Sequence, residues 1–299
     1  MSSFKNVAIV GASGSIGKII LDRLVASSEF NVTAIARQES KAVFPTGVTV
    51  RKSDFTEASL RDIFTGQDVV ISALGATGFG EQQKLVDAAV QAGVKRFLPS
   101  EFSASSEDEA VLQLLPLFGQ KKALTDYLKT QESKGLTWTG LATSGLFDWG
   151  LATGFLEFDL QKHTATIWDD GEKRFTLTNE KQLGDAVVSV LKHPKETSNQ
   201  YLHVYSVETS QNEILAALEK STGAKWIVTS TTTDEQVTEG RNKLGAGDFG
   251  GAFALVRATT FGNTTGLRSD YTKVESLAND ILGLKRESVQ ETTDRVVKK

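Results

Sequence analysis

A glycine-rich segment near the start of the chain has the spacing of a phosphate-binding loop. Gly11, Gly14 and Gly17 stand at every third position, directly after the apolar run 7–10. In such a loop the first glycine permits a tight turn, the second lets the backbone approach a pyrophosphate, and the third lets the next helix pack on the sheet. The free N–H groups at the start of that helix would face the phosphates. The predicted loop consists of Gly11, Ala12, Ser13, Gly14, Ser15, Ile16 and Gly17.

Basic residues follow the second apolar run, 32–36, where a dinucleotide site distinguishes its two coenzymes. A site for NAD usually has Asp or Glu there to bond the ribose 2′-OH. This chain has Arg37, and Lys41 follows shortly. A guanidinium can bind a 2′-phosphate through two parallel hydrogen bonds, and a lysine adds a second positive charge. The sequence therefore favours NADP(H). The alternative is a solvated arginine and lysine on a loop; Glu39 is close by but can point away.

Two further segments are expected to contact this cofactor. Asp54 and Phe55 close the third predicted strand, a position that commonly flanks the adenine. Equally, Asp54 could cap the helix that begins near Thr56. The fourth predicted strand ends in small residues, which would let the cofactor ribose lie against the backbone. These expected ribose contacts are Ala73, Leu74 and Gly75.

Composition excludes several other classes of site. The 299 residues include no cysteine, which excludes disulfides, thiol nucleophiles and cysteine-ligated metals, and three histidines are too few for a typical zinc cluster. We therefore expect no metal. A net charge of -4 gives no indication of nucleic-acid binding. No apolar stretch approaches the roughly 20 residues that span a bilayer, and no signal peptide is evident, so we expect a cytoplasmic protein.

The first half alternates short apolar runs with amphipathic stretches, as in a parallel sheet with crossover helices. This pattern predicts a doubly wound α/β Rossmann sheet that forms an NADP-binding domain over residues 1–150. The expected strands are 7–10, 32–36, 48–50, 68–74, 96–99 and 137–142. The expected helices are one beginning near Ile16, then 56–64, 80–92 and 121–134.

Beyond residue 150 the pattern is mixed, which predicts a smaller α+β substrate-binding subdomain over 151–299. Segments near 175–206, including a strand over 201–205, are expected to return to the Rossmann sheet. The final stretch, 285–299, is predicted to be a frayed helix or a tail. The other expected elements are strands at 164–168 and 174–177 and helices at 180–191, 210–220, 234–244 and 272–282.

With these motifs in place, the chain resembles the NmrA-like, isoflavone-reductase-like branch of the atypical short-chain dehydrogenases, and the segment 199–226 resembles its fungal members. The resemblance implies an NADPH-dependent reductase of a small aromatic or secondary-metabolite molecule. The alternative from the same family is an NADP(H)-binding redox sensor that regulates a partner without turnover. The resemblance rests on residues 11–17, Arg37, the run 87–97, Leu98-Pro99-Ser100-Glu101-Phe102, the run 136–139 and Phe147.

The resemblance also implies a catalytic lysine at the start of the helix after Phe102. Lys121 and Lys122 compete for this role. Lys121 is preferred because it puts Leu124 and Leu128 on the buried face. In a poorly solvated cleft its pKa would fall toward values useful for proton transfer, and it would lie close to the nicotinamide. The alternative is that both lysines are exposed.

The Tyr-x-x-x-Lys pair of ordinary short-chain dehydrogenases is missing, since Leu117 and Phe118 occupy the tyrosine positions. The family inference is therefore lysine-assisted hydride delivery to a benzylic or conjugated carbon.

The loop after the sixth strand lies at the carboxyl edge of the sheet, where ligands bind. Phe147 is expected to cover the nicotinamide and Trp149 to form a wall for an aromatic substrate. Such aromatics are as often core residues, and the Ser100–Glu101 pair could simply fix its loop. Family members often have Asn near Ser144, so the substrate anchor stays open, as does the oligomeric state. The predicted substrate contacts are Phe102, Ser144, Phe147 and Trp149.

Overall fold

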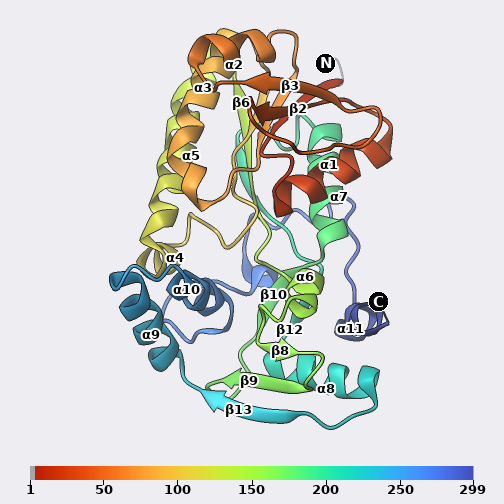
Figure 1. The fold of residues 1–299 in the computed structure, drawn as a ribbon, viewed down its shortest axis with the longest axis vertical. Helices are drawn as coiled ribbons and strands as arrows, with labels where there is room; N and C mark the ends of the chain where they lie inside the picture. The colour runs from red at the N-terminus through yellow and green to blue at the C-terminus, as the bar shows by residue number, and fades with distance from the viewer. Residues whose placement is uncertain (1–3, 299) are drawn as a thin grey trace.

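The computed structural model describes residues 4–298, which form an upper and a lower lobe (Figure 1). The upper lobe contains a seven-stranded parallel sheet in the order β11-β6-β5-β4-β1-β2-β3. The predicted doubly wound α/β fold is therefore confirmed. The strands are β1 (Asn6–Val10), β2 (Asn31–Arg37), β3 (Thr49–Ser53), β4 (Val69–Ser72), β5 (Arg96–Leu98), β6 (Thr137–Ala142) and β11 (Gln200–His203).

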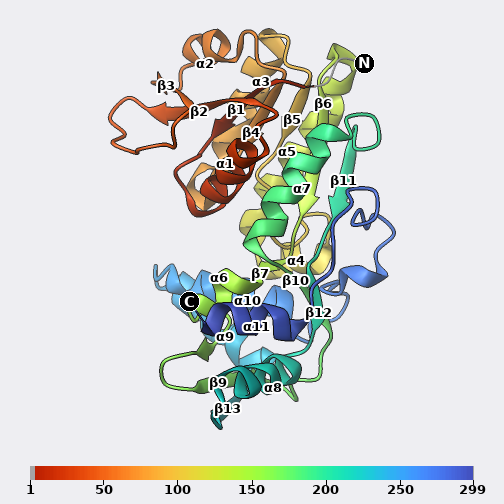
Figure 2. The same ribbon diagram turned by 90° about the vertical axis from the view of Figure 1, so that its right-hand side faces the viewer.

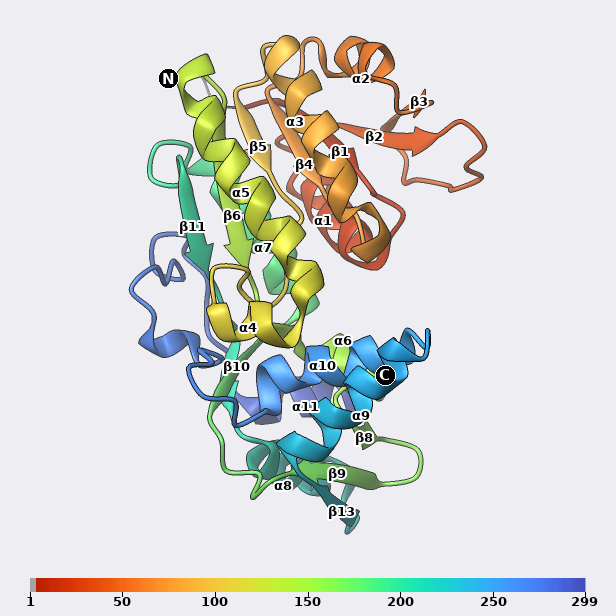
Figure 3. The ribbon, with the colours of Figure 1, turned by 90° about the vertical axis from the view of Figure 1, so that its left-hand side faces the viewer.

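Two helical layers cover this sheet because alternate strand residues face opposite sides. In β1, Val7 and Ile9 join one core while Ala8 and Val10 join the other. The first core contains α1 (Ser15–Ser27) and α7 (Glu180–Lys192), seen in front of the sheet in Figure 2. The second contains α2 (Glu57–Phe64), α3 (Gln82–Gln91) and α5 (Gly119–Gln131), which lie on the opposite face in Figure 3.

The upper lobe is completed by residues from the second half of the chain. β11 lies beside β6 at the edge of the sheet, and Tyr201 is in register with Gly140. Helix α7 packs against α1 and contributes Leu183 and Val187 to the first core. The main sheet and its cover are therefore discontinuous in sequence.

The lower lobe is a mixed α+β unit, as predicted. Its two small sheets have the orders β12-β10-β7 and β13-β9-β8, and the first lies between the main sheet and the second (Figure 2). Its strands are β7 (Gly145–Leu146), β8 (Phe158–Asp159), β9 (Thr164–Trp168), β10 (Phe175–Thr178), β12 (Val207–Thr209) and β13 (Ile227–Thr231). Its helices are α6 (Phe147–Ala152), α8 (Gln211–Thr222), α9 (Thr233–Gly245), α10 (Gly250–Phe261) and α11 (Val289–Val297).

The helix predicted over 272–282 is wrong. A single 3₁₀ turn, η4 (Tyr271–Lys273), is followed by further turns, between which Leu277 forms an isolated parallel bridge with His203 at the open edge of β11. His203 N donates to Ser276 O at 3.0 Å, and Ala278 N donates to His203 O at 2.9 Å. These bonds satisfy the sheet edge, which a helix would leave unpaired.

The carboxyl-terminal stretch is more ordered than predicted. α11 begins with a capping box between Ser288 and Glu291, and it packs against α8 and α6. Thr292, Thr293 and Val296 are buried by this packing. Among residues 4–298, no helix combines the length and apolar character needed to cross a membrane.

Candidate functional site

The glycine-rich loop joins β1 to α1 and depends on two missing side chains. Gly11 has φ +83°, and a Cβ there would lie 2.6 Å from the main-chain oxygen of Ala73. A Cβ at Gly17 would overlap the main-chain oxygen of Gly11. Gly17 is therefore needed for the turn of the loop itself. Gly14 is the N-cap of α1 in extended conformation and meets only an ordinary contact, so its Cβ position is free to face a ligand.

A cavity of about 430 Å³ opens beside this loop at the carboxyl edge of the sheet. Ser13, Arg37 and Gly75 contribute to it from three different strand ends. Pockets of this size hold small ligands and cofactors. The structure thus brings together Gly11, Ser13, Arg37, Phe55, Leu74 and Gly75 from the predicted cofactor site, with Ser40, Thr77, Glu81 and Lys84 among the other lining residues.

Basic residues lie at and after the carboxyl end of β2, and of the predicted pair it is Arg37, not Lys41, that lines the cavity. Arg37 ends β2 with its side chain 77% exposed, and its Nε lies 3.5 Å from Glu39, which does not point away as expected. Lys41 is exposed on the segment that follows. Sequence reasoning missed Lys52. This residue of β3 is in register with Ala36 of β2, and its Nζ donates to the main-chain oxygen of Ser40. Its register beside the end of β2 was the available signal.

The Asp54–Phe55 turn has a local role in addition to its expected one. The Asp54 carboxylate accepts from Thr56 N at 3.0 Å and from Thr56 Oγ1 at 2.8 Å, and these bonds lower its pKa. Thr56, not Asp54, is the N-cap of α2. Phe55 adopts φ +59° and lines the cavity. Contact of either residue with an adenine stays a prediction.

Lys121 is almost fully buried, with 3% of its surface exposed. It lies in the first turn of α5, which begins after the short helix η2 (Pro116–Phe118). Its Nζ donates to Glu101 O at 2.8 Å and to Ser103 Oγ at 2.8 Å. The ammonium also lies 4.7 Å and 4.3 Å from the ring centroids of Phe79 and Phe118.

This environment sets Lys121 apart from its neighbour. Removal from water lowers the pKa of Lys121 to about 8, and the negative charge of Glu101 partly opposes the fall. Lys122 is more exposed and pairs with Asp126 at 2.6 Å and Glu107 at 3.6 Å. Of these two neighbours, Lys121 is therefore the one whose proton affinity is lowered by burial; the pKa of Lys173 is also lowered to about 8.

Lys121 connects to the cavity through η1 (Ala76–Glu81). This 3₁₀ helix supplies Phe79 to the lysine, while its Thr77 and Gly78 line the cavity. The Ser100 hydroxyl donates to Leu74 O at 2.7 Å and ties the loop after β5 to the cavity wall. The Ser100–Glu101 pair does fix its loop by hydrogen bonds, as the alternative interpretation held.

The predicted substrate contacts divide between the loop that holds Lys121, where Phe102 lies and to which Ser144 is bonded, and helix α6 of the lower lobe, which carries Phe147 and Trp149. Phe102 is 5% exposed and belongs to the first core. Phe147 is fully buried in the core of the lower lobe, so contact with a cofactor or substrate would require it to turn outward. Ser144 has φ +54°, and its N–H donates to Ser103 O at 3.1 Å. Trp149 is partly exposed and its ring centroid lies 5.3 Å from that of Phe155.

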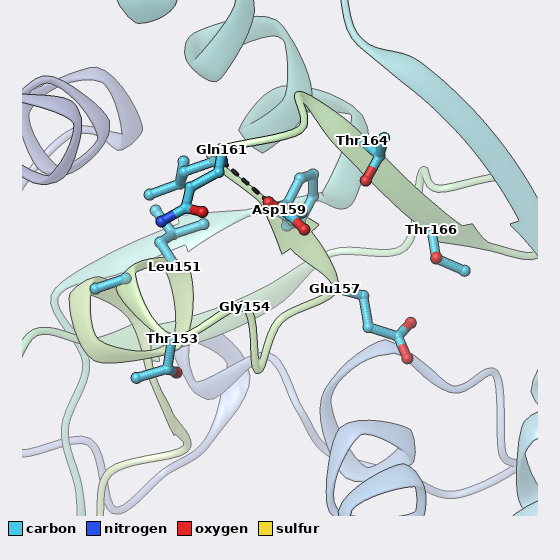
Figure 4. A pocket seen from close by; sticks show the side chains of 11 residues that line it. Leu151, Thr153, Gly154, Glu157, Asp159, Gln161, Thr164 and Thr166 are labelled. Carbon is cyan, nitrogen blue, oxygen red and sulfur yellow. Dashed lines mark hydrogen bonds between the residues drawn. The ribbon is translucent and has the colours of Figure 1, made fainter.

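A second cavity, of about 510 Å³, lies in the lower lobe between α6 and the β8–β9 hairpin (Figure 4). Asp159, Thr164 and Glu157 line it, and Asp159 Oδ1 accepts from Gln161 N at 3.0 Å. Its lining includes no residue of the predicted site among those described in the structure. We therefore place the candidate site at the glycine-rich loop and Lys121.

Comparison with known sequences gives relatives along nearly the whole chain. The oxidoreductase aprR of Aspergillus flavus is 36% identical over 295 residues, covering 98% of both chains. The oxidoreductase poxI of Penicillium oxalicum is 32% identical, covering 96% of this chain and 92% of its own. An isoflavone reductase homolog from Zea mays, IRL, is 29% identical over 75% of this chain and 76% of its own.

Solved structures show the same fold at low sequence identity. A ternary complex of leucoanthocyanidin reductase from Vitis vinifera matches with a TM-score of 0.81 at 17% identity, covering 98% of this chain and 100% of the other. AtPrR2 with NADP+ and (+)pinoresinol matches with a TM-score of 0.78 at 20% identity, covering 99% and 100%. The model of the NmrA-like family matches residues 3–244. With the glycine-rich loop, the buried lysine and these relatives in agreement, the chain belongs to the NmrA-like family.

Proposed function

We propose that this protein is an NADPH-dependent reductase of a small molecule of aromatic or secondary-metabolite type, in which Lys121 assists the reaction. The observation that carries the proposal is the burial of Lys121 beside η1, the element that also lines the cavity of the glycine-rich loop. Relatives named as oxidoreductases, and structural neighbours solved with NADPH or NADP+, support the reaction type and the coenzyme.

The residues of this cavity fit the coenzyme. The N–H groups at the start of α1 would face a pyrophosphate beside Gly14, whose position carries no side chain. Arg37, with Lys41, supplies positive charge for the 2′-phosphate. Leu74 and Gly75 leave space against the backbone at the end of β4. Bound NADPH supplies the hydride for the reduction.

Lys121 provides the group that can hold or move a proton. With a pKa of about 8 it is mainly an ammonium at neutral pH, yet it can release a proton without the cost of an ordinary lysine. As an ammonium it would stabilise negative charge that develops on a substrate oxygen or carbon, and burial strengthens that interaction.

Activity measurements on matched lysine variants test this role. Lys121→Met should lower kcat by about 10²- to 10⁴-fold, as expected for loss of a general acid or base. Lys122→Met is the matched control and should retain most activity, because Lys122 lies at the surface in ion pairs. The assay follows NADPH oxidation with aromatic compounds that carry a benzylic ether or a conjugated double bond. Equal loss in both variants would remove Lys121 from its proposed role.

One observation favours the alternative function of a redox sensor. Lys121 is 3% exposed and its Nζ is enclosed by two protein oxygens and the rings of Phe79 and Phe118, so a substrate would reach it only after these groups move. A protein that binds NADPH tightly, as shown by a raised melting temperature, but oxidises it with no compound of these classes would favour the sensor.

A further inference from the structure

Glu101 is a buried carboxylate that the proposed reaction does not yet use. It follows β5 and has 1% of its surface exposed. Tyr201 Oη donates to its Oε2 at 2.6 Å, and Ser106 Oγ donates to its Oε1 at 3.0 Å. These two hydroxyl donors supply the partners that a buried carboxylate needs, and they fix its position.

Tyr201 reaches Glu101 because of a missing side chain on the neighbouring strand. Gly140 on β6 is in register with Tyr201, and a Cβ there would lie 2.7 Å from the phenol ring. The Tyr201 oxygen also accepts from Ser106 N at 2.9 Å, so its own proton is directed to Glu101. Burial and the charge of Glu101 raise the pKa of Tyr201 well above its usual value, which keeps the phenol protonated.

The same residue touches Lys121 through its backbone. Lys121 Nζ donates to the main-chain oxygen of Glu101, and the carboxylate acts on the ammonium through its charge. The other elements that contact the lysine contribute neutral rings, Phe79 from η1 and Phe118 from η2. The phenols of Tyr201 and the buried Tyr271 face Glu101, and the charge of Asp108 also acts on Tyr271. The His203 ring packs against both phenols, and burial lowers its pKa to about 4, so it is neutral in the range where Lys121 titrates. Glu101 is therefore the counter-charge of Lys121.

We propose that Glu101 is a positioning residue: its carboxylate, bound by Tyr201 and Ser106, anchors the loop whose Glu101 O and Ser103 Oγ hold Lys121 Nζ, and its negative charge acts on that ammonium. This inference rests on the proposed function in one respect only, namely that the Lys121 ammonium takes part in a reduction. Because the carboxylate is not hydrogen-bonded to Nζ, the lysine stays free to exchange its Ser103 bond for a substrate atom.

Direct titration of the lysine tests the proposal without any turnover. Protein labelled with ¹³C at the lysine ε-carbon is titrated by NMR, and Lys121→Arg assigns the signal. In the wild type the midpoint of the Lys121 titration should lie at a pH of about 8. Glu101→Gln should lower it by about 1 pH unit or more, since an opposite charge is lost in a desolvated site. Glu107→Gln removes a nearby carboxylate that pairs with Lys122 and Lys129 instead, and it should leave the midpoint unchanged.

A second, more conservative variant keeps the test decisive if Glu101→Gln fails to fold. Tyr201→Phe removes one donor to the carboxylate but leaves its charge, so it should change the midpoint of Lys121 by less than Glu101→Gln does. An unchanged midpoint in both folded variants would overturn the proposal, even if the protein is an active reductase. The expected shifts in a protein that reduces nothing would instead uphold the role of Glu101 and remove the reductase function.

Discussion

At the scale of single residues, the site is governed by which charges are removed from water. Lys121 and Lys122 are adjacent in sequence, yet one is buried between two phenylalanine rings and the other pairs with surface carboxylates. Desolvation of an ammonium favours its neutral form, and a nearby carboxylate opposes this effect. The proton affinity of Lys121 therefore results from its environment.

This desolvation predicts a pH-dependent stability. The pKa of Lys121 is about 8 in the folded chain against a usual value of 10.5, so between these pH values the unfolded chain binds more protons. The free energy of unfolding contributed by this group therefore rises with pH across that window, by about 3 kcal/mol in total. Urea unfolding at about pH 7 and about pH 10 should show wild type gaining stability relative to Lys121→Met. A constant difference between the two proteins would contradict the burial of a charged Lys121.

A charge at the surface, that of Arg37, is expected to decide the choice of coenzyme. Arg37→Ala removes a guanidinium that can fork onto a 2′-phosphate, so the Kd for NADPH should rise about 10- to 100-fold while the Kd for NADH changes little. Calorimetric titration measures both constants. Arg51→Ala is a suitable control, because Arg51 is a similarly exposed arginine that pairs with Asp62. If wild type binds NADH as tightly as NADPH, the assignment of Arg37 fails.

At the scale of elements, glycines allow backbones to approach where side chains would block them. Gly17 lies against Gly11 in the loop, and Gly251 of α10 lies against Gly240 of α9. The sequence analysis missed α10 because two glycines at its start weaken the helical pattern. The segment 272–282 has a helical pattern, but its pairing with β11 is preferred. In both cases a tertiary contact outweighs a local preference.

Two substitutions in the glycine-rich loop should separate folding from binding. Gly17→Ala places a methyl group on the Gly11 carbonyl and should cost about 1–3 kcal/mol of stability. Gly14→Ala meets only an ordinary contact at 3.4 Å, so its stability should stay within about 0.5 kcal/mol of wild type. It should still weaken NADPH binding by about 10-fold, because the methyl group occupies the expected position of the pyrophosphate. Undiminished NADPH binding by Gly14→Ala would place the pyrophosphate elsewhere.

At the scale of the whole molecule, the second half of the chain completes the first. Helix α7 covers α1 and the sheet, and β11 brings Tyr201 to Glu101 across 100 residues of sequence. The upper lobe therefore depends on segments that follow the lower lobe's first strands in the chain.

A truncated chain should reveal this dependence. A fragment of residues 1–150 lacks α7 and β11 and would expose the apolar surface that Leu183, Val187 and Leu202 cover. It should unfold without a cooperative transition, whereas the full chain should show one. Urea titration followed by circular dichroism distinguishes the two. Cooperative unfolding of the fragment, together with NADPH binding, would show that residues 1–150 form an independent domain.

By itself, the sequence determined the parallel sheet, the glycine-rich loop and the family, because strand periodicity, the φ requirement at Gly11 and helix patterns are local properties of the chain. The tertiary structure decided which lysine is buried, where Tyr201 donates its proton and why Phe147 lies in a core. Those outcomes depend on desolvation and on contacts between residues 100 or more positions apart. No pattern within a short window of sequence encodes them, since they arise only when β5, β11 and α5 are packed together.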